Sequence, residues 1–437
     1  MKKTKKWIKN RLGTKNRERF FFLFRLIKYL RKQTRRIFRD LGSDGRSELL
    51  LPSEEYFIED KNVFFGYYDK SPFSDNGEVI LVQVAKGQNK HPQVGDELIV
   101  GFFCRQAGSS GRGIVELGRT TTWCWQQGCR LQWFPGDGSK KIIYNKLINK
   151  RFSSVVQDTE SKRVVKSLSF PVYDVDPSGS CALTLSFSRL YRLRPGYGYA
   201  GIIDETIDEK IPSSDGIWLG NIKKNEKSLL LSLEKISQMD WNEKMVGAQH
   251  YVNFISYNKD GSKFAFLHVW EGGEGRSVRL MIFDFARGEL SVVGQGHEMV
   301  SHYSWIDDSS IIFTSLAKKG YGIYYTYNTI SKETIVVGGN ELTGDGHPSA
   351  CGDSSLFITD TSADEYGERK LILFDGLKGK KRELFRLVDP IGFWGEVRCD
   401  FHPRWDSSGR YVCIDCPVSG KRRMSVFDLS VVLRDFS

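Results

Sequence analysis

Three of the seven histidines stand at one position of a repeated sequence pattern. His302, His347 and His402 each precede by seven residues the turn position of the phrase that contains them. Neutral imidazoles are good ligands for manganese, zinc or iron, and they also serve as general acids and bases. The shared spacing predicts that the three side chains meet. It leaves open a metal site, metal-free catalysis, and simple hydrogen bonding between repeats.

A second set of candidate residues lies in the longest gap between two turn positions, residues 179–261. Arginines and tyrosines alternate around a Pro-Gly pair in the segment 186–199. A guanidinium group binds anions with a fork of donors, and a tyrosine ring offers a flat face on which a sugar stacks. The pattern predicts an acidic carbohydrate as the ligand. The alternative is a surface loop whose arginines pair with the acids of residues 204–209.

An elimination reaction on such a sugar needs a base, an acid and a cation beside the carboxylate. His250 is the candidate base, and Tyr197 or His302 is the candidate acid. Arg189 or Arg194 would bind the carboxylate of the substrate. The further candidates for substrate binding are Tyr68, Asp69, Arg192, Tyr199, Arg398 and Arg404.

The elements that position these residues are encoded by a phrase that occurs seven times after residue 45. The phrase is a polar Asp/Ser/Gly turn followed by alternating apolar residues, which is typical of a tight turn that leads into a half-buried strand. Its copies are SPFSDNGEVILV (71–82), QWFPGDGSKKIIYN (132–145), DVDPSGSCALTLSF (174–187), ISYNKDGSKFAFLH (255–268), SWIDDSSIIFTS (304–315), SACGDSSLFITD (349–360) and PRWDSSGRYVCID (403–415).

The interval between copies, roughly 55 residues, is near the period of propeller repeats once insertions are allowed for. The sequence therefore predicts an all-β, seven-bladed β-propeller over residues 46–437. The histidines would lie at the ends of the innermost strands, away from the turns. The last repeat lacks an outer strand, and residues 48–59 have nothing else to pair with, so we expect this segment to close the ring.

The repeats resemble those of TolB-type propellers, and the copy HPRWDSSG (402–409) is similar to the repeats of oligogalacturonate lyase and its relatives. The resemblance spans residues 60–430. It implies a lyase whose His/Gln cluster holds a metal that helps to bind a substrate carboxylate. This chain departs from the Gln-x-x-His-x-His motif of that cluster and has GHPS (346–349) instead.

The N-terminal residues form a separate, strongly basic arm. Residues 1–39 hold sixteen Lys or Arg and one acid, Glu18, whereas residues 40–437 hold 48 basic and 52 acidic residues. From Phe20 onward, apolar residues recur at helical spacing between the basic ones. We predict that residues 1–45 are a basic amphipathic helical arm and linker, whose residues 1–40 bind an anionic membrane surface. A targeting peptide and an arm for a protein partner are the alternatives.

Composition also limits the partners and the compartment. Because the basic charge is confined to the arm, we do not expect a nucleic-acid-binding domain. The apolar runs of the arm are too short for a membrane span or a secretion signal, and eight cysteines then fit a reducing compartment. We expect a cytoplasmic protein, peripheral on the inner membrane face, that binds an acidic oligosaccharide or polysaccharide precursor. If the protein is an enzyme, the reaction is a lyase-type elimination. The alternative is a non-catalytic scaffold that recruits a partner in envelope-polysaccharide biosynthesis.

Overall fold

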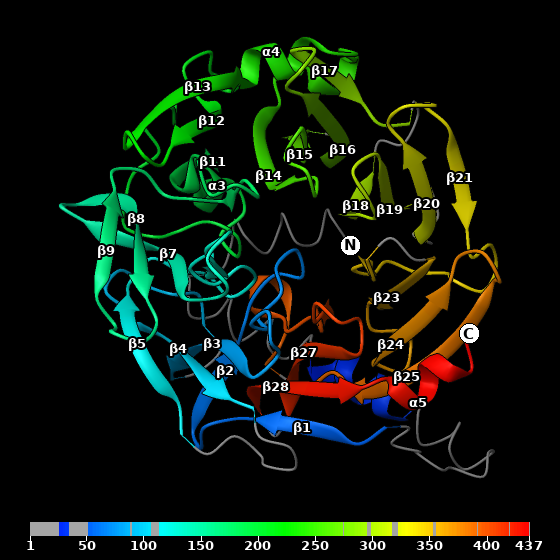
Figure 1. The fold of residues 1–437 in the computed structure, drawn as a ribbon. Helices are drawn as coiled ribbons and strands as arrows, with labels where there is room; N and C mark the ends of the chain where they lie inside the picture. Colours follow the sequence, from blue (N-terminus) through cyan, green and yellow to red (C-terminus); the bar gives the residue numbers. More distant parts are fainter. Residues whose placement is uncertain are drawn as a thin grey trace.

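Seven four-stranded antiparallel sheets surround a common axis in the computed structural model of the chain (Figure 1). This arrangement confirms the predicted all-β, seven-bladed propeller. The structure describes residues 26–34, 51–87, 90–105, 113–273, 275–294, 299–316, 322–352, 355–390, 392–418 and 420–436. The remainder of the predicted arm, in residues 1–25 and 35–50, lies outside these ranges.

Each sheet is one blade, whose four strands follow one another from the axis outward. The first three blades are β2 (Lys61–Phe64), β3 (Val79–Lys86), β4 (Leu98–Cys104) and β5 (Val115–Thr120); β6 (Gln132–Trp133), β7 (Lys141–Ile148), β8 (Arg151–Asp158) and β9 (Val164–Leu168); and β10 (Asp174–Val175), β11 (Cys181–Leu185), β12 (Gly216–Asn221) and β13 (Glu226–Ser232).

The other four blades complete the ring. They are β14 (Gln249–Tyr257), β15 (Lys263–Gly272), β16 (Gly275–Asp284) and β17 (Glu289–Val292); β18 (Val300–Trp305), β19 (Ser310–Leu316), β20 (Gly322–Asn328) and β21 (Thr334–Val337); β22 (Ser349–Ala350), β23 (Leu356–Asp360), β24 (Glu368–Asp375) and β25 (Lys380–Val388); and β26 (Arg404–Trp405), β27 (Tyr411–Val418), β28 (Lys421–Asp428) and β1 (Ser53–Tyr56).

The last blade takes its outer strand from the N-terminal side of the first repeat. β1 pairs antiparallel with β28, with Ser53 opposite Phe427 and Tyr56 opposite Met424. This pairing confirms the predicted ring closure. It also covers an edge of β28 that would otherwise be open to another chain.

The repeated phrase forms the turn between the two inner strands of a blade because its polar residues bond to their own backbone. In the last blade the Asp406 carboxylate accepts hydrogen bonds from the backbone N–H of Arg410 at 3.0 Å and of Tyr411 at 2.8 Å. Gly409 has a φ of +69°, a conformation that is strained for residues with a Cβ. Such Asx-type bonds and a left-handed glycine make the phrase a tight hairpin.

A tryptophan at the end of the inner strand ties each of three blades to the blade before it. The indole N–H groups of Trp133, Trp305 and Trp405 donate to the carbonyl oxygens of Pro72, Ser256 and Ser349, at 3.1, 3.2 and 3.0 Å. The same contact thus fixes three of the seven blade junctions.

Because adjacent strands run in opposite directions, the connections fall on two faces. We call the face that carries the hairpins of the repeated phrase the turn face, and the face on which the inner strands begin the histidine face. The histidine face also carries α3 (Phe187–Leu193), α4 (Leu233–Gln238), and the short 3-10 helices η1 (Glu243–Met245) and η2 (Gly395–Val397), whereas α5 (Ser430–Arg434) follows β28 on the turn face.

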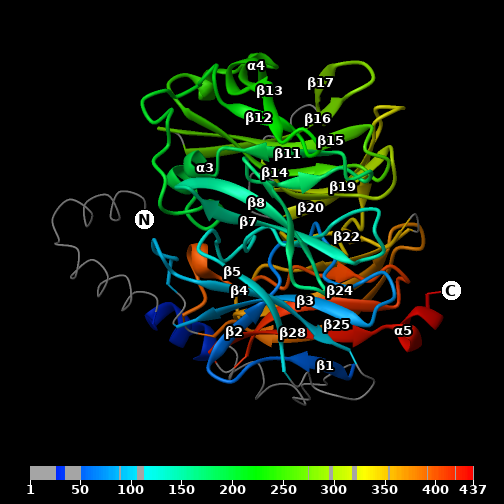
Figure 2. The same cartoon turned by 60° about the vertical axis from the view of Figure 1, so that its left-hand side comes forward.

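The described part of the arm is a helix over residues 26–34, as predicted. Figure 2 shows this dark-blue helix on the same side of the propeller as α3, with α5 on the other side. Lys32 fastens it there, because its Nζ donates to the backbone oxygen of Asp364 at 2.7 Å, in the link between β23 and β24. Among the helices of the described ranges, none is long and apolar enough to cross a membrane.

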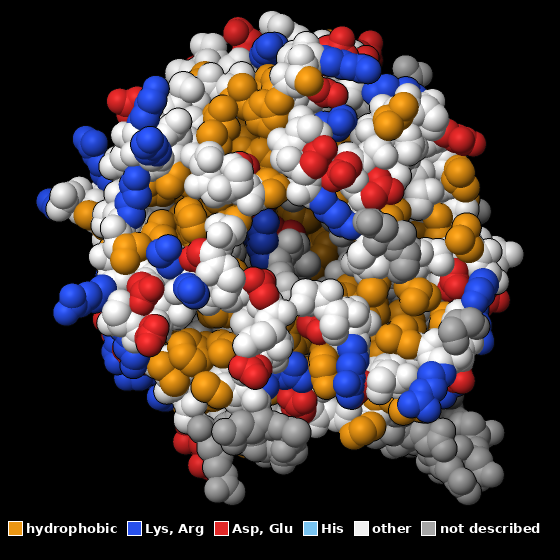
Figure 3. All heavy atoms as spheres, viewed as in Figure 1, with side chains coloured by type: hydrophobic (Ala, Val, Ile, Leu, Met, Phe, Trp, Pro, Cys, Tyr) orange, Lys and Arg blue, Asp and Glu red, His pale blue; other side chains and the backbone are white. Residues whose placement is uncertain are grey.

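The turn face is hollowed around the axis, and charged side chains lie inside the hollow (Figure 3). A cavity of about 310 Å³ lies there, lined by Lys70, Tyr257 and Trp305 among others. The Tyr68 hydroxyl reaches across the axis to Tyr303 in β18. It donates to the backbone oxygen of Tyr303 at 2.8 Å and accepts from the N–H of the same residue at 2.9 Å.

Candidate functional site

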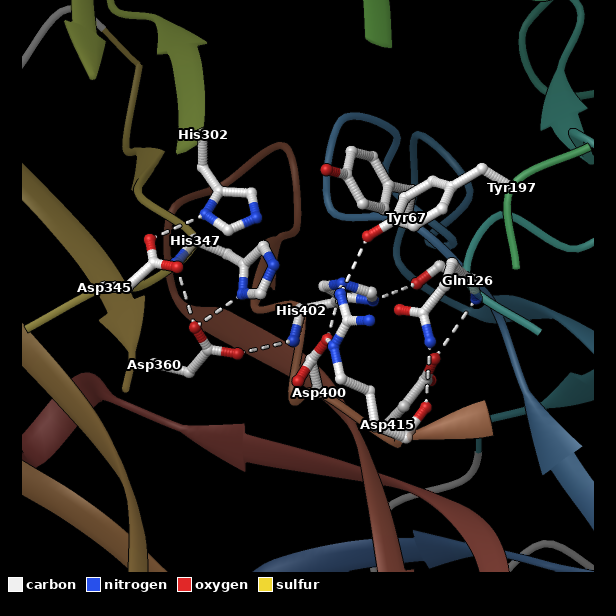
Figure 4. Close-up of polar contacts among 12 residues, drawn as sticks. Tyr67, Gln126, Tyr197, His302, Asp345, His347, Asp360, Asp400, His402 and Asp415 are labelled. Carbon is white, nitrogen blue, oxygen red and sulfur yellow. Dashed lines mark hydrogen bonds and ion pairs between the residues drawn. The ribbon is translucent and has the colours of Figure 1, made fainter. Parts of the chain in front are cut away.

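The three repeat-related histidines meet at the axis of the propeller, as their common spacing predicts. His302 lies in β18, and His347 and His402 each precede an inner strand by two residues. The ring centroids of His302 and His347 are 3.9 Å apart, and those of His347 and His402 are 4.4 Å apart (Figure 4). We call these three residues the histidine cluster.

Each imidazole of the cluster uses its Nδ1 to bond an oxygen. The partners are Asp345 Oδ1 for His302 at 3.1 Å, Asp360 Oδ1 for His347 at 2.7 Å, and the backbone oxygen of Gly66 for His402 at 2.8 Å. Because oxygen is the acceptor, Nδ1 carries the proton and Nε2 keeps its lone pair. The buried Nε2 atoms of His347 and His402 have no hydrogen-bond partner among the described residues.

Asp400 completes a set of ligand atoms with two of these histidines. One ligand atom each of His347, Asp400 and His402 lie within 4.8 Å of one another. Burial alone would raise the pKa of the Asp400 carboxyl, but the guanidinium groups of Arg398 and Arg369 outweigh burial and hold that pKa well below its usual value. Two imidazoles and an ionised carboxylate are a donor set that suits manganese, zinc or iron.

Burial keeps the other imidazoles of the cluster uncharged. Burial lowers the pKa of His302, and it lowers that of His402 well below its usual value. His302 is not part of the three-atom ligand set, although its ring touches His347. Its Nδ1–H is held by Asp345 and its Nε2 lone pair is left over, which is the state of a general base.

Two arginines and two tyrosines lie next to the cluster. The Tyr197 hydroxyl accepts hydrogen bonds from Arg398 Nη2 at 2.7 Å and Arg194 Nη2 at 3.3 Å, and the Arg194 guanidinium also lies 4.1 Å from the Tyr197 ring centroid. Tyr67 connects the two groups, since its ring meets Tyr197 edge-on at 6.1 Å and His402 at 4.9 Å. Paired guanidinium groups beside imidazoles can bind a carboxylate.

Three separate loops hold this arginine side in place. Gln126 Nε2 donates to the backbone oxygens of Glu396 at 3.2 Å and Arg398 at 3.0 Å, and the Gln126 N–H donates to the oxygen of Gly196 at 3.3 Å. A Cβ on Gly196 would lie 2.4 Å from the Glu396 carboxylate, so this contact requires glycine. The insertion between β11 and β12, which contains Gly196, therefore packs against the link between β25 and β26, which contains Arg398.

Comparisons with known proteins show the fold. No family model and no curated protein sequence matches the chain. A solved oligogalacturonate lyase in complex with manganese is similar with a TM-score of 0.60 and 13% identity over 88% of this chain and 98% of that one. The chain has the oligogalacturonate lyase fold. A second such lyase, from Vibrio parahaemolyticus, has a TM-score of 0.60 and 11% identity over 88% of this chain and 95% of its own.

Within this oligogalacturonate lyase fold, two of the predicted arginines fasten the insertion instead of facing the cluster. Arg189 is 1% exposed, and its guanidinium donates to backbone oxygens that include those of Thr206 at 3.1 Å and His250 at 2.8 Å. Arg192 pairs with Asp204 at 2.8 Å. For these two arginines the structure shows the alternative in which the loop neutralises its own acids, and Arg194 alone of the three reaches Tyr197.

His250, the predicted base, lies apart from the cluster. Its side chain is 0% exposed and its Nδ1 is 3.0 Å from Nε2 of His268. Its ring contacts are with Trp241, His268 and Trp270. Burial lowers the pKa of His250 to about 4. The reason for the displacement is its spacing, since His250 stands eleven residues before its turn and not seven.

Two further predicted binding residues are engaged in buried contacts. The Asp69 carboxylate receives both Arg130 Nη1 at 3.0 Å and Arg130 Nη2 at 2.6 Å, and both side chains are buried. The Tyr199 hydroxyl accepts from Asn145 Nδ2 at 3.0 Å and its side chain is 0% exposed. The structure thus places both residues in the framework of the fold.

Arg404 and Tyr68 build the floor under the cluster. Arg404 donates to both carboxylate oxygens of Asp415, at 3.1 and 2.9 Å, and to the backbone oxygen of Tyr67 at 3.1 Å. The Tyr68 ring meets His347 at 5.1 Å while its hydroxyl is fixed on the far side of the axis. Of the predicted residues, the structure brings together the histidine cluster, Tyr197, Arg194 and Arg398, with the ring of Tyr68 beneath them.

The aspartates that bond to or lie beside the cluster histidines were not among the predicted residues. Two of them nevertheless stand in a recognisable sequence pattern. Asp345 and Asp400 each precede a cluster histidine by two residues, in the segments DGHP (345–348) and DFHP (400–403). A repeated Asp-x-His-Pro is therefore the motif of this site. Asp360 and Gln126 have no comparable local pattern.

Proposed function

We propose that the protein binds an acidic oligosaccharide at the histidine cluster and cleaves it by β-elimination, with a divalent metal ion, in the first place manganese, at His347, Asp400 and His402. The observation that carries this proposal is that one ligand atom each of His347, Asp400 and His402 lie within 4.8 Å of one another, while the Nδ1 atoms of both histidines are bonded to oxygen, which leaves Nε2 for a metal. The similarity to a lyase that was solved with manganese supports the choice of metal and of substrate class.

The residues present fit such an ion. Each ligand histidine has the oxygen partner on Nδ1 that metal-binding histidines have in general. When bound, the metal would supply positive charge that stabilises the substrate carboxylate as it gains enolate character. The remaining roles belong to side chains of the chain itself.

Arg194 and Arg398 would bind and orient the uronate carboxylate. Both guanidinium groups point at the Tyr197 hydroxyl, and both are partly exposed, unlike Arg189 and Arg404. A carboxylate placed between them would be neutralised by charge-assisted hydrogen bonds.

His302 is the base and Tyr197 the acid of the proposed step. His302 Nε2 takes the proton from the carbon next to the carboxylate, and the electron pair of that C–H bond forms a carbon–carbon double bond. The glycosidic C–O bond breaks, and the leaving oxygen takes the proton of the Tyr197 hydroxyl. His302 then returns its proton to water and Tyr197 takes one up, so no oxidant and no net water is consumed.

The test combines metal analysis with an elimination assay on the full chain. After loading with manganese and dialysis, we expect close to one ion per chain in the parent protein and none in a His347→Gln/His402→Gln variant. With digalacturonate as the probe, elimination appears as ultraviolet absorbance of the conjugated double bond. The His302→Gln variant should keep the metal and lose the absorbance.

Two outcomes would overturn this assignment. Equal metal content in the parent and the double variant would remove the metal site. Binding of digalacturonate without formation of a double bond would favour the non-catalytic scaffold.

A further inference from the structure

We propose that the histidine face is the surface with which the protein docks on an anionic membrane. The cluster would then receive an acidic glycan carried on a membrane lipid, a detail of the substrate that rests on the proposed function. The docking itself rests on the exposed side chains of this face.

The helix of residues 26–34 exposes two large apolar side chains. Ile27 and Leu30 are 43% and 53% exposed, next to the exposed side chains of Lys28, Arg31 and Thr34. The partly buried side carries Leu26 and Tyr29 together with Lys32, which bonds to the backbone at Asp364. A soluble helix normally buries its apolar stripe, whereas a helix at a lipid surface exposes it to the lipid.

The exposed apolar side chains in the loops are concentrated on the same face. Seven large ones lie in links that open on the histidine face: Phe57, Val94, Ile203, Ile207, Trp241, Val246 and Trp394. Outside its strands, the turn face exposes three in the described ranges, Ile330 and Leu377 in hairpin connections and Val431 in α5. Apolar loop tips that share one face can enter the boundary between head groups and acyl chains.

The exposed tryptophans also lie on the histidine face. Within the described ranges, two tryptophans are exposed by more than a third, Trp241 at 47% and Trp394 at 46%. Both stand in links between blades on the histidine face, before β14 and before β26. Tryptophan prefers the membrane interface, because its ring is apolar and its N–H is polar.

The positive charge of the N-terminal arm favours an anionic lipid surface over an uncharged apolar partner. Residues 1–39 hold sixteen basic residues and one acid. Two buried acids of the histidine face are paired within the protein, Asp204 with Arg192 and Asp400 with Arg398, whereas Glu205, Asp208 and Glu209 are exposed. Basic residues near an anionic leaflet add attraction that salt screens.

The loops that would touch lipid are the loops that carry the site. Trp394 lies four residues before Arg398, in the link from β25 to β26. Ile203 lies in the insertion that contains Tyr197. Docking through these loops would place the arginine side of the cluster next to the head groups, where a lipid-carried glycan is presented.

The first experiment measures vesicle binding of the full chain. We expect binding to vesicles of phosphatidylcholine with phosphatidylglycerol, a fall of about tenfold or more in affinity on pure phosphatidylcholine, and weakening at high salt. An Ile27→Asp/Leu30→Asp variant should lose about tenfold in affinity. The matched control, Ile330→Asp/Leu377→Asp, carries the same charge change on the turn face and should bind as the parent does.

The second experiment tests the orientation. Trp7 of the basic arm is first changed to phenylalanine, so that its fluorescence does not contribute. In this Trp7→Phe background, bound protein should show quenching of tryptophan fluorescence by brominated lipid acyl chains. Most of this quenching should vanish in a Trp241→Phe/Trp394→Phe variant. Unchanged quenching, or equal losses of binding in the two aspartate variants, would overturn the proposed face. Binding that is independent of anionic lipid would refute the anionic surface and indicate a different partner.

A third variant separates this inference from the enzymatic proposal. His347→Gln/His402→Gln, which should lose metal and elimination, must still bind the vesicles with parental affinity. Vesicle binding by the parent without elimination would refute the enzyme and leave the docking face. Elimination without vesicle binding would refute the docking face and leave the enzyme.

Discussion

The histidine cluster and the floor directly beneath it use the same residue types in opposite ways. In the floor, Arg404 and Asp415 satisfy each other completely, and Asp415 also accepts from the backbone N–H groups of Phe65 and Gly66 at 3.1 Å each. In the cluster, the Nε2 atoms of His347 and His402 have no such partner among the described residues.

The two regions are only two residues apart in sequence at Arg404 and His402, so proximity to a functional residue does not make a side chain functional. The two regions differ in how many hydrogen-bonding positions of their polar groups remain without a partner. A buried polar group whose bonds are all made stabilises the fold, whereas one with a lone pair left over is available to a ligand. Four measurements test this difference.

The largest effect is expected in the floor. Arg404→Met leaves the Asp415 carboxylate buried without its cation, which should lower the free energy of unfolding by about 3–5 kcal/mol. The control is Arg410→Met, because Arg410 is also paired with an aspartate, Asp428, but lies exposed. That change should have little effect, since water and salt screen an exposed ion pair. Equal costs in denaturant unfolding would contradict the assignment of Arg404 to the floor.

The interior histidine pair should appear in the pH dependence of stability. The pKa of His250 is about 4 in the folded protein and 6.5 ordinarily. Above pH 6.5 neither state binds the proton. As the pH falls from 6.5 to 4, the unfolded state binds it first, so the free energy of unfolding falls by up to about 3 kcal/mol.

Urea unfolding at a series of pH values measures this effect. His268, His302 and His402, whose pKa values burial also lowers, add to the slope of the parent protein. The decisive quantity is therefore the difference between the parent and His250→Gln, which should lose part of the slope. Identical slopes in the two proteins would rule out a low pKa for His250.

Metal should stabilise the cluster and not the interior pair. Manganese at a hundred times its dissociation constant should raise the free energy of unfolding by about 2.7 kcal/mol. Thermal unfolding should show this rise in the parent and in His250→Gln, but not in His347→Gln. A rise that survives His347→Gln would place the metal elsewhere.

The smallest effect on stability is expected on the arginine side. Arg194→Met should change the free energy of unfolding by about 0.5 kcal/mol or less, because the guanidinium group makes its side-chain hydrogen bond and its ring contact with the neighbouring Tyr197. Its affinity for digalacturonate should nevertheless fall about tenfold by calorimetry, through loss of a charge-assisted bond. Arg192→Met, two residues away, should keep the parental affinity.

Much of the architecture was predictable because it is local. The seven hairpins depend on short Asp/Ser/Gly turns, and the unpaired segment before the first repeat predicted the closure that β1 makes with β28. The meeting of His302, His347 and His402 was also predictable, since equal spacing from equal turns places side chains at equal radius from the axis.

The choice among arginines was not predictable in this way. Arg189, Arg192 and Arg194 are equivalent as a sequence pattern, yet they contact a backbone clamp, an aspartate and the tyrosine, respectively. Arg398 meets Tyr197 across 201 residues of chain. Asp360 serves His347 from the next strand, and no spacing rule links it to the histidines.

The repeat, the closure and the common address of three histidines could thus be read from the order of the residues, because each follows from short-range turn chemistry and period. Which polar groups satisfy one another, and which keep a free lone pair, was settled by the folded arrangement. That outcome depends on the packing of loops from different blades around one axis, where partners far apart in the chain compete for the same buried donors and acceptors.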